Sequence, residues 1–155
     1  MNVYAATNFF TALFCSGPNT GEALRLDAVA DLEGAPAYPV TMICRLEFVN
    51  ALQQSVYSTR HGVPGIHITQ EHAMAVEAMF FDELSAGKTL CDATMSERLL
   101  ERRFQDLSHR HTAKEGFRTY DILHVSSALV LGCDTFWSFD AKARKLAEQE
   151  GPAVN

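Results

Sequence analysis

The chain has 155 residues, 47% apolar and 21% charged, and this composition predicts a soluble globular protein with one sizeable core. The formal net charge of -6 argues against a general nucleic-acid-binding protein. No apolar run reaches the roughly 18 residues of a membrane-spanning helix. The chain does not start with a basic leader and an apolar run, so the expected location is the cytoplasm. The four cysteines form no C-x-x-C pair, which argues against a zinc site and fits a reducing compartment.

Apolar runs typical of strands alternate with helical patterns, which predicts an α/β fold, an open parallel sheet with helices on both faces. In the first half we expect strands at residues 2–6 and 40–43, helices at residues 9–14, 21–32 and 46–56, and a loop at residues 34–39. In the second half we expect strands at residues 89–93 and 135–139, helices at residues 70–86, 96–111, 120–131 and 141–149, and a loop at residues 61–67. Residues 153–155 could add a strand, which gives four to five strands in a single domain over residues 1–155.

Apolar spacing within two of these helices predicts which side chains are buried. The helix at residues 70–86 should bury one stripe, formed by Ala73, Val76, Met79, Phe80 and Leu84. In the first helix, Phe9 and Phe10 share a face with two further apolar residues and are expected in the core. One ring of this group could instead be exposed as a docking surface for a partner.

Three acids stand in apolar surroundings, where a carboxylate is costly unless something pairs with it. Asp121 opens an apolar helix and Asp140 follows the fourth strand, so a helix dipole or an N-cap could explain each of them. Glu47 is flanked by apolar residues, and capping does not explain it. Ligands bind at the carboxyl edge of an open parallel sheet, and there we expect these acids to meet Ala6, which ends the first strand. Carboxylates at such an edge suit Mg²⁺ or Mn²⁺.

Four segments of the chain resemble, in order, the motifs of PIN-domain ribonucleases, and within that family the VapC-like toxins of toxin–antitoxin pairs. The segments are Val3-Tyr4-Ala5-Ala6-Thr7-Asn8, Glu47 to Leu52, Arg118 to Ala128, and Phe136 to Asp140 with Arg144 to Ala147 behind it. No single motif is decisive, but four of them in order at suitable spacings cover nearly the whole chain. The resemblance implies a PIN-like α/β fold.

The resemblance also implies an endoribonuclease that uses Mg²⁺ or Mn²⁺ held by a quartet of acids. Position by position, the metal and catalytic acids would be Glu47, Asp121 and Asp140, supported by Thr7, Asn8 and Ser138. The first acid of the quartet is expected at position 6, where Ala6 cannot bind a metal. The alanine is either an engineered replacement or a natural loss, and the intact residues around it favour the first. Cleavage by this chain should therefore be impaired.

Partners follow from the same resemblance: an RNA substrate, with transfer RNA as one candidate, a VapB-like antitoxin that blocks the acidic site, and a second copy in a homodimer. An alternative is a naturally degenerate PIN domain that binds RNA or an antitoxin without cleaving. A phosphoryl-accepting receiver domain is a third class, but it needs a lysine after the fifth strand, and none stands there.

Several charged residues have two candidate roles. His124 could touch the acids, but in an apolar helix a hydrogen-bonded structural role is favoured. Arg118 is expected to contact a phosphate or a partner carboxylate. Asp134 precedes the fourth strand and should lie at the opposite edge of the sheet, whereas Asp92 is a weaker candidate for the acidic edge. The basic residues form either a solvated helix face or a phosphate-contacting face, and they are Arg98, Arg102, Arg103, Arg110, Lys114 and Arg118.

Overall fold

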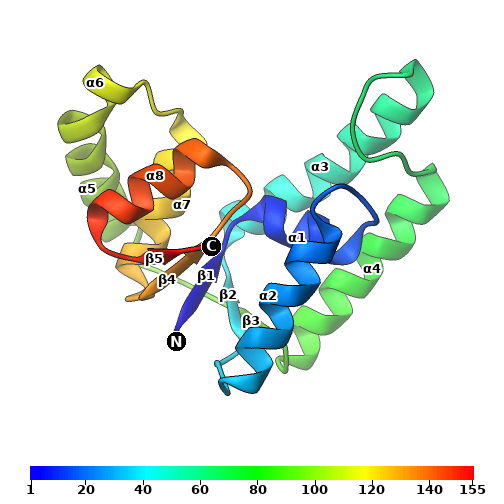
Figure 1. Cartoon of the computed structure of the whole chain (residues 1–155), viewed down its shortest axis with the longest axis horizontal. Helices are drawn as coiled ribbons and strands as arrows, with labels where there is room; N and C mark the ends of the chain where they lie inside the picture. Colours follow the sequence, from blue (N-terminus) through cyan, green and yellow to red (C-terminus); the bar gives the residue numbers. More distant parts are fainter.

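Parallel strands run through the centre of the molecule in the computed structural model, which describes all 155 residues (Figure 1). Strands β1 (Val3–Ala5), β4 (Thr135–Trp137) and β5 (Ala153–Val154) form one parallel sheet in the order β1-β4-β5. Strands β2 (Tyr38–Val40) and β3 (Leu90–Asp92) form a second parallel pair, and β2 lies beside β1. The fifth strand, at the end of the chain, is therefore present and pairs with β4.

Helices cover both faces of these strands. One face carries α1 (Thr7–Phe14), α2 (Thr20–Leu32), α3 (Met42–His61) and α4 (Gln70–Ala86). The other carries α5 (Glu97–Leu107), the π-helical segment η1 (Ser108–Thr112), α6 (Ala113–Glu115), α7 (Thr119–Val130) and α8 (Ala141–Glu150). The predicted α/β fold is confirmed. None of the helices combines the length and the apolar character needed to cross a lipid bilayer.

Strand alternation divides the interior into two cores. Val3 and Ala5 of β1 point into the core under α1 to α4, and Tyr4 between them points into the core under α5, α7 and α8. On β4, Phe136 and Trp137 divide in the same way. Because both faces are buried, these strands read as continuous apolar runs in the sequence.

The second strand was expected at residues 40–43, and this prediction is wrong. The strand is Tyr38–Val40, and α3 already begins at Met42. The hydroxyl of Thr41 accepts a hydrogen bond from the backbone N–H of Cys44 at 3.3 Å, which caps the helix and stops the strand. The earlier start brings α3 to twenty residues, ending at His61.

Pro39 was expected in a loop but lies in the middle of β2. Its orientation in the strand explains why proline is tolerated there. The N–H of Tyr38 donates to Thr89 and the carbonyl of Val40 accepts from Ala93, so these two residues face β3. Pro39 therefore faces β1, where its missing N–H leaves no ladder bond to be made. The hydrogen-bonded sheet is interrupted between β1 and β2 at this point.

Two further expectations need correction. Ala73, Val76 and Phe80 of α4 are buried as predicted, but Met79 is 55% exposed. Successive residues turn by about 100° around an α-helix, which places Met79 beside the stripe instead of on it. The helix expected at residues 96–111 changes to π-helical geometry at Ser108 and continues as far as Glu115.

The cap of α3 can be tested directly, because this helix carries Glu47. We expect Thr41→Ala to lower the free energy of unfolding by about 1 kcal/mol, the usual cost of losing a side-chain cap. Urea denaturation followed by circular dichroism measures this loss. Thr41→Ser is the control, because it keeps the hydroxyl and should keep most of the stability. Equal losses in both variants would show that the cap does not contribute.

Candidate functional site

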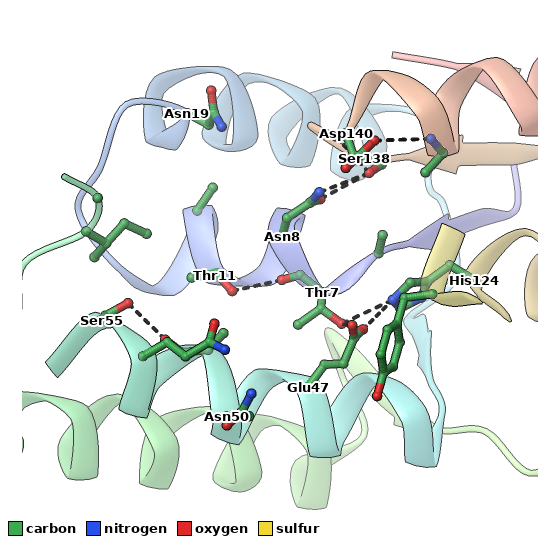
Figure 2. Close-up of a pocket in the computed structure, with 18 of the residues that line it drawn as sticks. Thr7, Asn8, Thr11, Asn19, Glu47, Asn50, Ser55, His124, Ser138 and Asp140 are labelled. Carbon is green, nitrogen blue, oxygen red and sulfur yellow. Dashed lines mark hydrogen bonds and ion pairs between the residues drawn. The ribbon is translucent and has the colours of Figure 1, made fainter. Parts of the chain in front are cut away.

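A groove of about 1050 Å³ opens where β1 and β4 end and their chains turn into α1 and α8 (Figure 2). Its walls are α1, the face of α3 turned toward it, and the first turns of α7 and α8. The three acids singled out from the sequence, Glu47, Asp121 and Asp140, all line this groove, and so does Ala6. Thr7, Asn8, Ser138 and Arg118 line it as well.

Glu47 reaches the groove from α3 and is held by two side chains. The hydroxyl of Thr7 donates to one of its carboxylate oxygens at 2.7 Å, and Nε2 of His124 donates to the same oxygen. Burial by itself would raise the pKa of Glu47, but the hydrogen bond and charge of His124, together with Thr7, bring that pKa below its usual value. Glu47 is therefore a carboxylate with fixed orientation at neutral pH.

His124 is buried and hydrogen-bonded, as the favoured structural role predicts, and it also touches the acid Glu47, which was the other role considered for it. Its Nδ1 lies 2.9 Å from the phenol oxygen of Tyr4, which is fully buried. Burial raises the pKa of Tyr4, so the phenol stays neutral, and its oxygen can accept from Nδ1–H while Nε2–H donates to Glu47. The signal in the sequence was the spacing of three residues between Asp121 and His124 on one helix.

Asp121 and Asp140 share one cation, Arg118. Asp121 is 5% exposed and accepts from the backbone N–H of Arg118 at 2.8 Å, which is one half of a capping box at the start of α7, and from Nε of Arg118 at 3.2 Å. The same guanidinium forms an ion pair with Asp140. Burial would raise the pKa of Asp140, but the backbone N–H groups of Lys142 and Ala143 and the charge of Arg118 lower it. Arg118 thus pairs with carboxylates of its own chain, and contact with a carboxylate was one of the two roles expected for it.

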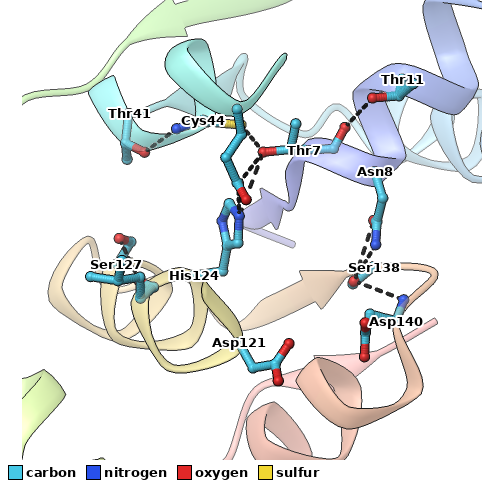
Figure 3. Close-up of polar contacts among 12 residues, drawn as sticks. Thr7, Asn8, Thr11, Thr41, Cys44, Asp121, His124, Ser127, Ser138 and Asp140 are labelled. Atoms are coloured by element: carbon cyan, nitrogen blue, oxygen red, sulfur yellow. Dashed lines mark hydrogen bonds and ion pairs between the residues drawn. The ribbon is translucent and has the colours of Figure 1, made fainter. Parts of the chain in front are cut away.

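Asn8 and Ser138 hold the turn that presents Asp140 (Figure 3). The amide nitrogen of Asn8 donates to the hydroxyl of Ser138 at 3.1 Å, and the amide oxygen accepts from the backbone N–H of Phe139 at 3.1 Å. The hydroxyl of Ser138 accepts from the backbone N–H of Asp140 at 3.1 Å. The hydrogen bonds of both side chains therefore go to the loop after β4.

With alanine at position 6, the groove does not fit a metal centre. No three side chains of histidine, cysteine, aspartate or glutamate are placed so that they could hold a metal ion together. Arg118 already bridges Asp121 and Asp140, and His124 already pairs with Glu47. Ala6 contributes no oxygen. The carboxylates are the right ligand type for Mg²⁺ or Mn²⁺, but each of them is already engaged by a cationic or hydrogen-bonding side chain of the chain itself.

The remaining charged candidates lie outside the groove. Asp134 accepts from the backbone N–H of Asn2 at the start of β1, so it lies at the opposite edge of the sheet as predicted. Asp92 forms an ion pair with Arg45 and does not line the groove.

The basic residues of α5 and η1 do not line the groove either. Arg103 and Arg110 pair with Asp106, and Arg110 also pairs with Glu150 of α8. Of the two roles expected for these basic residues, a solvated and ion-paired helix face therefore fits better than a face that contacts phosphate beside the acids. Arg118 is the basic side chain that reaches the groove.

Comparisons with known proteins rest on structure, because no family model and no curated protein matches this sequence. The crystal structure of VapC20 from Mycobacterium tuberculosis, a toxin that cleaves the sarcin–ricin loop, matches with a TM-score of 0.62. The match covers 92% of each chain at 20% sequence identity. The chain has the PIN-like fold of VapC20. At this level of identity, the likeness to VapC20 extends to the fold alone.

The pairing of Glu47 with His124 predicts a pH-dependent contribution to stability. The pKa of Glu47 is lowered in the folded protein, so its ion stabilises the fold above the unfolded pKa of about 4.3, and this contribution disappears as the pH falls through the folded pKa. We expect Glu47→Gln to cost about 1.5–3 kcal/mol near pH 7, the usual worth of hydrogen bonds to a charged group, and clearly less at acidic pH.

Urea titrations across this pH range measure the difference between parent and variant. Glu22→Gln is the matched control, because Glu22 is exposed on α2 and pairs only with Arg25. That change should have a small effect at every pH. A Glu47→Gln penalty that stays constant with pH would contradict the role of His124.

Proposed function

We propose that this chain is an endoribonuclease toxin of the VapC type, part of a toxin–antitoxin pair, whose cleavage is impaired by Ala6. The observation that carries the proposal is that Ala6 and the three acids line one groove on a fold shared with VapC20. The order and spacing of the four sequence motifs support it independently. RNA is the proposed substrate class, and a VapB-like antitoxin is the proposed partner.

The negative charge of the groove repels RNA phosphate unless a cation is bound, and Ala6 lacks the carboxylate that would help to bind one. Cleavage by this chain should therefore be impaired. An RNA phosphate approaching Glu47, Asp121 and Asp140 meets three carboxylates, and only Arg118 among the groove residues carries a permanent positive charge. We propose that Mg²⁺ or Mn²⁺ is the cofactor of the form with aspartate at position 6. A bound divalent ion of this kind supplies an activated water and stabilises charge on a phosphoryl group.

The backbone at position 6 suits aspartate. Ala6 is the N-cap residue of α1, with extended backbone angles, and no side chain caps that helix. Aspartate is among the preferred residues at this position, because its carboxylate accepts hydrogen bonds from the free N–H groups of the first turn. Without a metal ion, however, a fourth carboxylate in this groove would repel the other three.

Restoring the acid tests the proposed activity. We expect Ala6→Asp to raise Mn²⁺-dependent cleavage of RNA by on the order of a hundredfold to a thousandfold, the usual loss when one strong electrostatic contact is removed. Mn²⁺ should also raise the melting temperature of Ala6→Asp more than that of the parent chain. Cleavage is followed by gel electrophoresis and melting by differential scanning fluorimetry.

A second substitution separates RNA cleavage by this protein from cleavage by a contaminating ribonuclease. The double variant Ala6→Asp with Asp121→Asn should not cleave, since it again lacks one acid. Equal and robust cleavage by the parent and Ala6→Asp would show that position 6 is not part of the centre. If Ala6→Asp binds RNA or an antitoxin but never cleaves, the degenerate binding module is the better description.

Exposed apolar side chains at the groove rim support a protein partner there. Leu46 is 65% exposed and Tyr120 is 55% exposed, and both line the groove. Phe9 and Phe10 are fully buried, as the core expectation for them predicted, so neither is the exposed ring considered as a docking surface. We propose that the antitoxin covers Leu46 and Tyr120 as it blocks the acids. A homodimer remains part of the proposal by analogy with such toxins.

Arg118 should also contribute to RNA affinity, since its side chain is 64% exposed at the groove. We expect Arg118→Gln to weaken binding of a short single-stranded RNA, because it removes a cation and leaves Asp121 and Asp140 to repel phosphate. The slope of log affinity against log salt should fall by about 1. Arg98→Gln, an exposed change on α5 outside the groove, is the control. Equal losses in both variants would place RNA elsewhere.

A further inference from the structure

The groove is divided by charge along its length. Its acidic and basic side chains are gathered at the end where β1 and β4 stop, and they are Glu47, Arg118, Asp121, His124 and Asp140. Beyond Glu47 the walls carry amides, hydroxyls and small apolar groups but no charged side chain. Asn19, before α2, and Ile66, in the loop between α3 and α4, close the far end. This neutral half has no role in the function proposed so far.

One face of α3 forms the floor of the groove from end to end. Glu47, Asn50, Gln54 and Ser58 follow one another at spacings of three, four and four residues, so they lie in a row on the helix. At 1.5 Å per residue, the row extends about 16 Å along the helix axis. Figure 2 shows Glu47 and Asn50 on α3, across the groove from Asn8 on α1. A flexible single-stranded nucleic acid bound with its reacting group at Glu47 would therefore pass over Asn50 and then Gln54.

The two amides of this row are free to bind a ligand. Both side chains are exposed, and neither makes a hydrogen bond within the chain. Their neighbour Gln53 behaves differently, since it accepts a hydrogen bond from Gln70 of α4 and does not line the groove. Ala51 and Ile66 offer apolar surface beside the amides, against which a flat ring can pack.

We propose that Asn50 and Gln54 read the base edges of single-stranded RNA next to the scissile phosphate. This inference rests on the proposed ribonuclease function and assigns the specificity-determining part of the same groove. A side-chain amide presents a donor and an acceptor together, which is the pattern that base edges offer. Proteins recognise RNA sequence chiefly in single strands, whose unstacked bases expose these edges. Neutral amides add no positive charge to attract phosphates, and Ala51 beside them offers apolar surface to a flat ring, so we assign the bases and not the backbone to this face of α3.

The test measures base preference in the parent chain, whose impaired cleavage keeps the RNA intact during binding. Fluorescence anisotropy is recorded with labelled single-stranded oligoadenylate, oligocytidylate and oligouridylate of equal length. We expect the parent to bind one of them tenfold or more tighter than the others, the discrimination that one good amide–base contact provides. The double variant Asn50→Ala with Gln54→Ala should bind all three within about threefold of one another, with an unchanged salt dependence.

Controls separate this inference from the proposed function. Gln53→Ala, one position away on α3 but outside the groove, should keep the parent's preference. The single variants Asn50→Ala and Gln54→Ala should each lose part of it, and circular dichroism confirms that all variants stay folded. A preference that persists in the folded double variant, or a parent that binds all three oligonucleotides equally, would overturn the reading of bases while leaving the ribonuclease proposal in place. A parent that binds none of them would overturn both proposals and point to a peptide as the occupant.

Discussion

Unpaired carboxylates cannot be buried cheaply, and this constraint shapes the whole groove. Asp121 and Asp140 are brought together where α7 and α8 begin, and Glu47 is brought to the same groove by α3. In this chain each carboxylate pairs with another side chain of the groove. Arg118 bridges the two aspartates, and His124 pairs with the glutamate. These side chains would have to move or share their contacts if a metal ion entered.

The strands decide where these helices begin. β1 and β4 are parallel and in register, so the residues that follow them, Ala6 and Ser138, come out on the same edge of the sheet. Pro39 removes a ladder bond between β1 and β2, yet β2 still lies beside β1 and directs α3 across the groove. The carboxyl edge of a parallel sheet thus supplies three helix starts around one hollow, which is the usual place for a ligand site in such folds.

Charge and neutrality divide the groove between two tasks. The ionisable end suits chemistry at a phosphate once its charge is balanced, whereas the row of amides on α3 suits recognition of flat, neutral groups. A single helix carries both parts, since Glu47 stands at one end of the row and Ser58 at the other. Movement of α3 would therefore change recognition and chemistry together. Leu46, exposed and apolar, lies at the rim of the same groove.

The sequence alone determined the elements that depend on local pattern. Alternating strands and helices, the parallel sheet and the acids near helix starts could be read from short-range periodicity, whereas the alanine at position 6 stood out through the resemblance to PIN-domain motifs. Tertiary structure decided which side chain neutralises which acid, because His124 and Glu47 are 77 positions apart in the sequence. It also placed the second strand at Pro39, since only pairing with β3 shows that the missing N–H faces away from the ladder. Local pattern sets helices and strands, whereas contacts between distant residues set the charge balance of the groove.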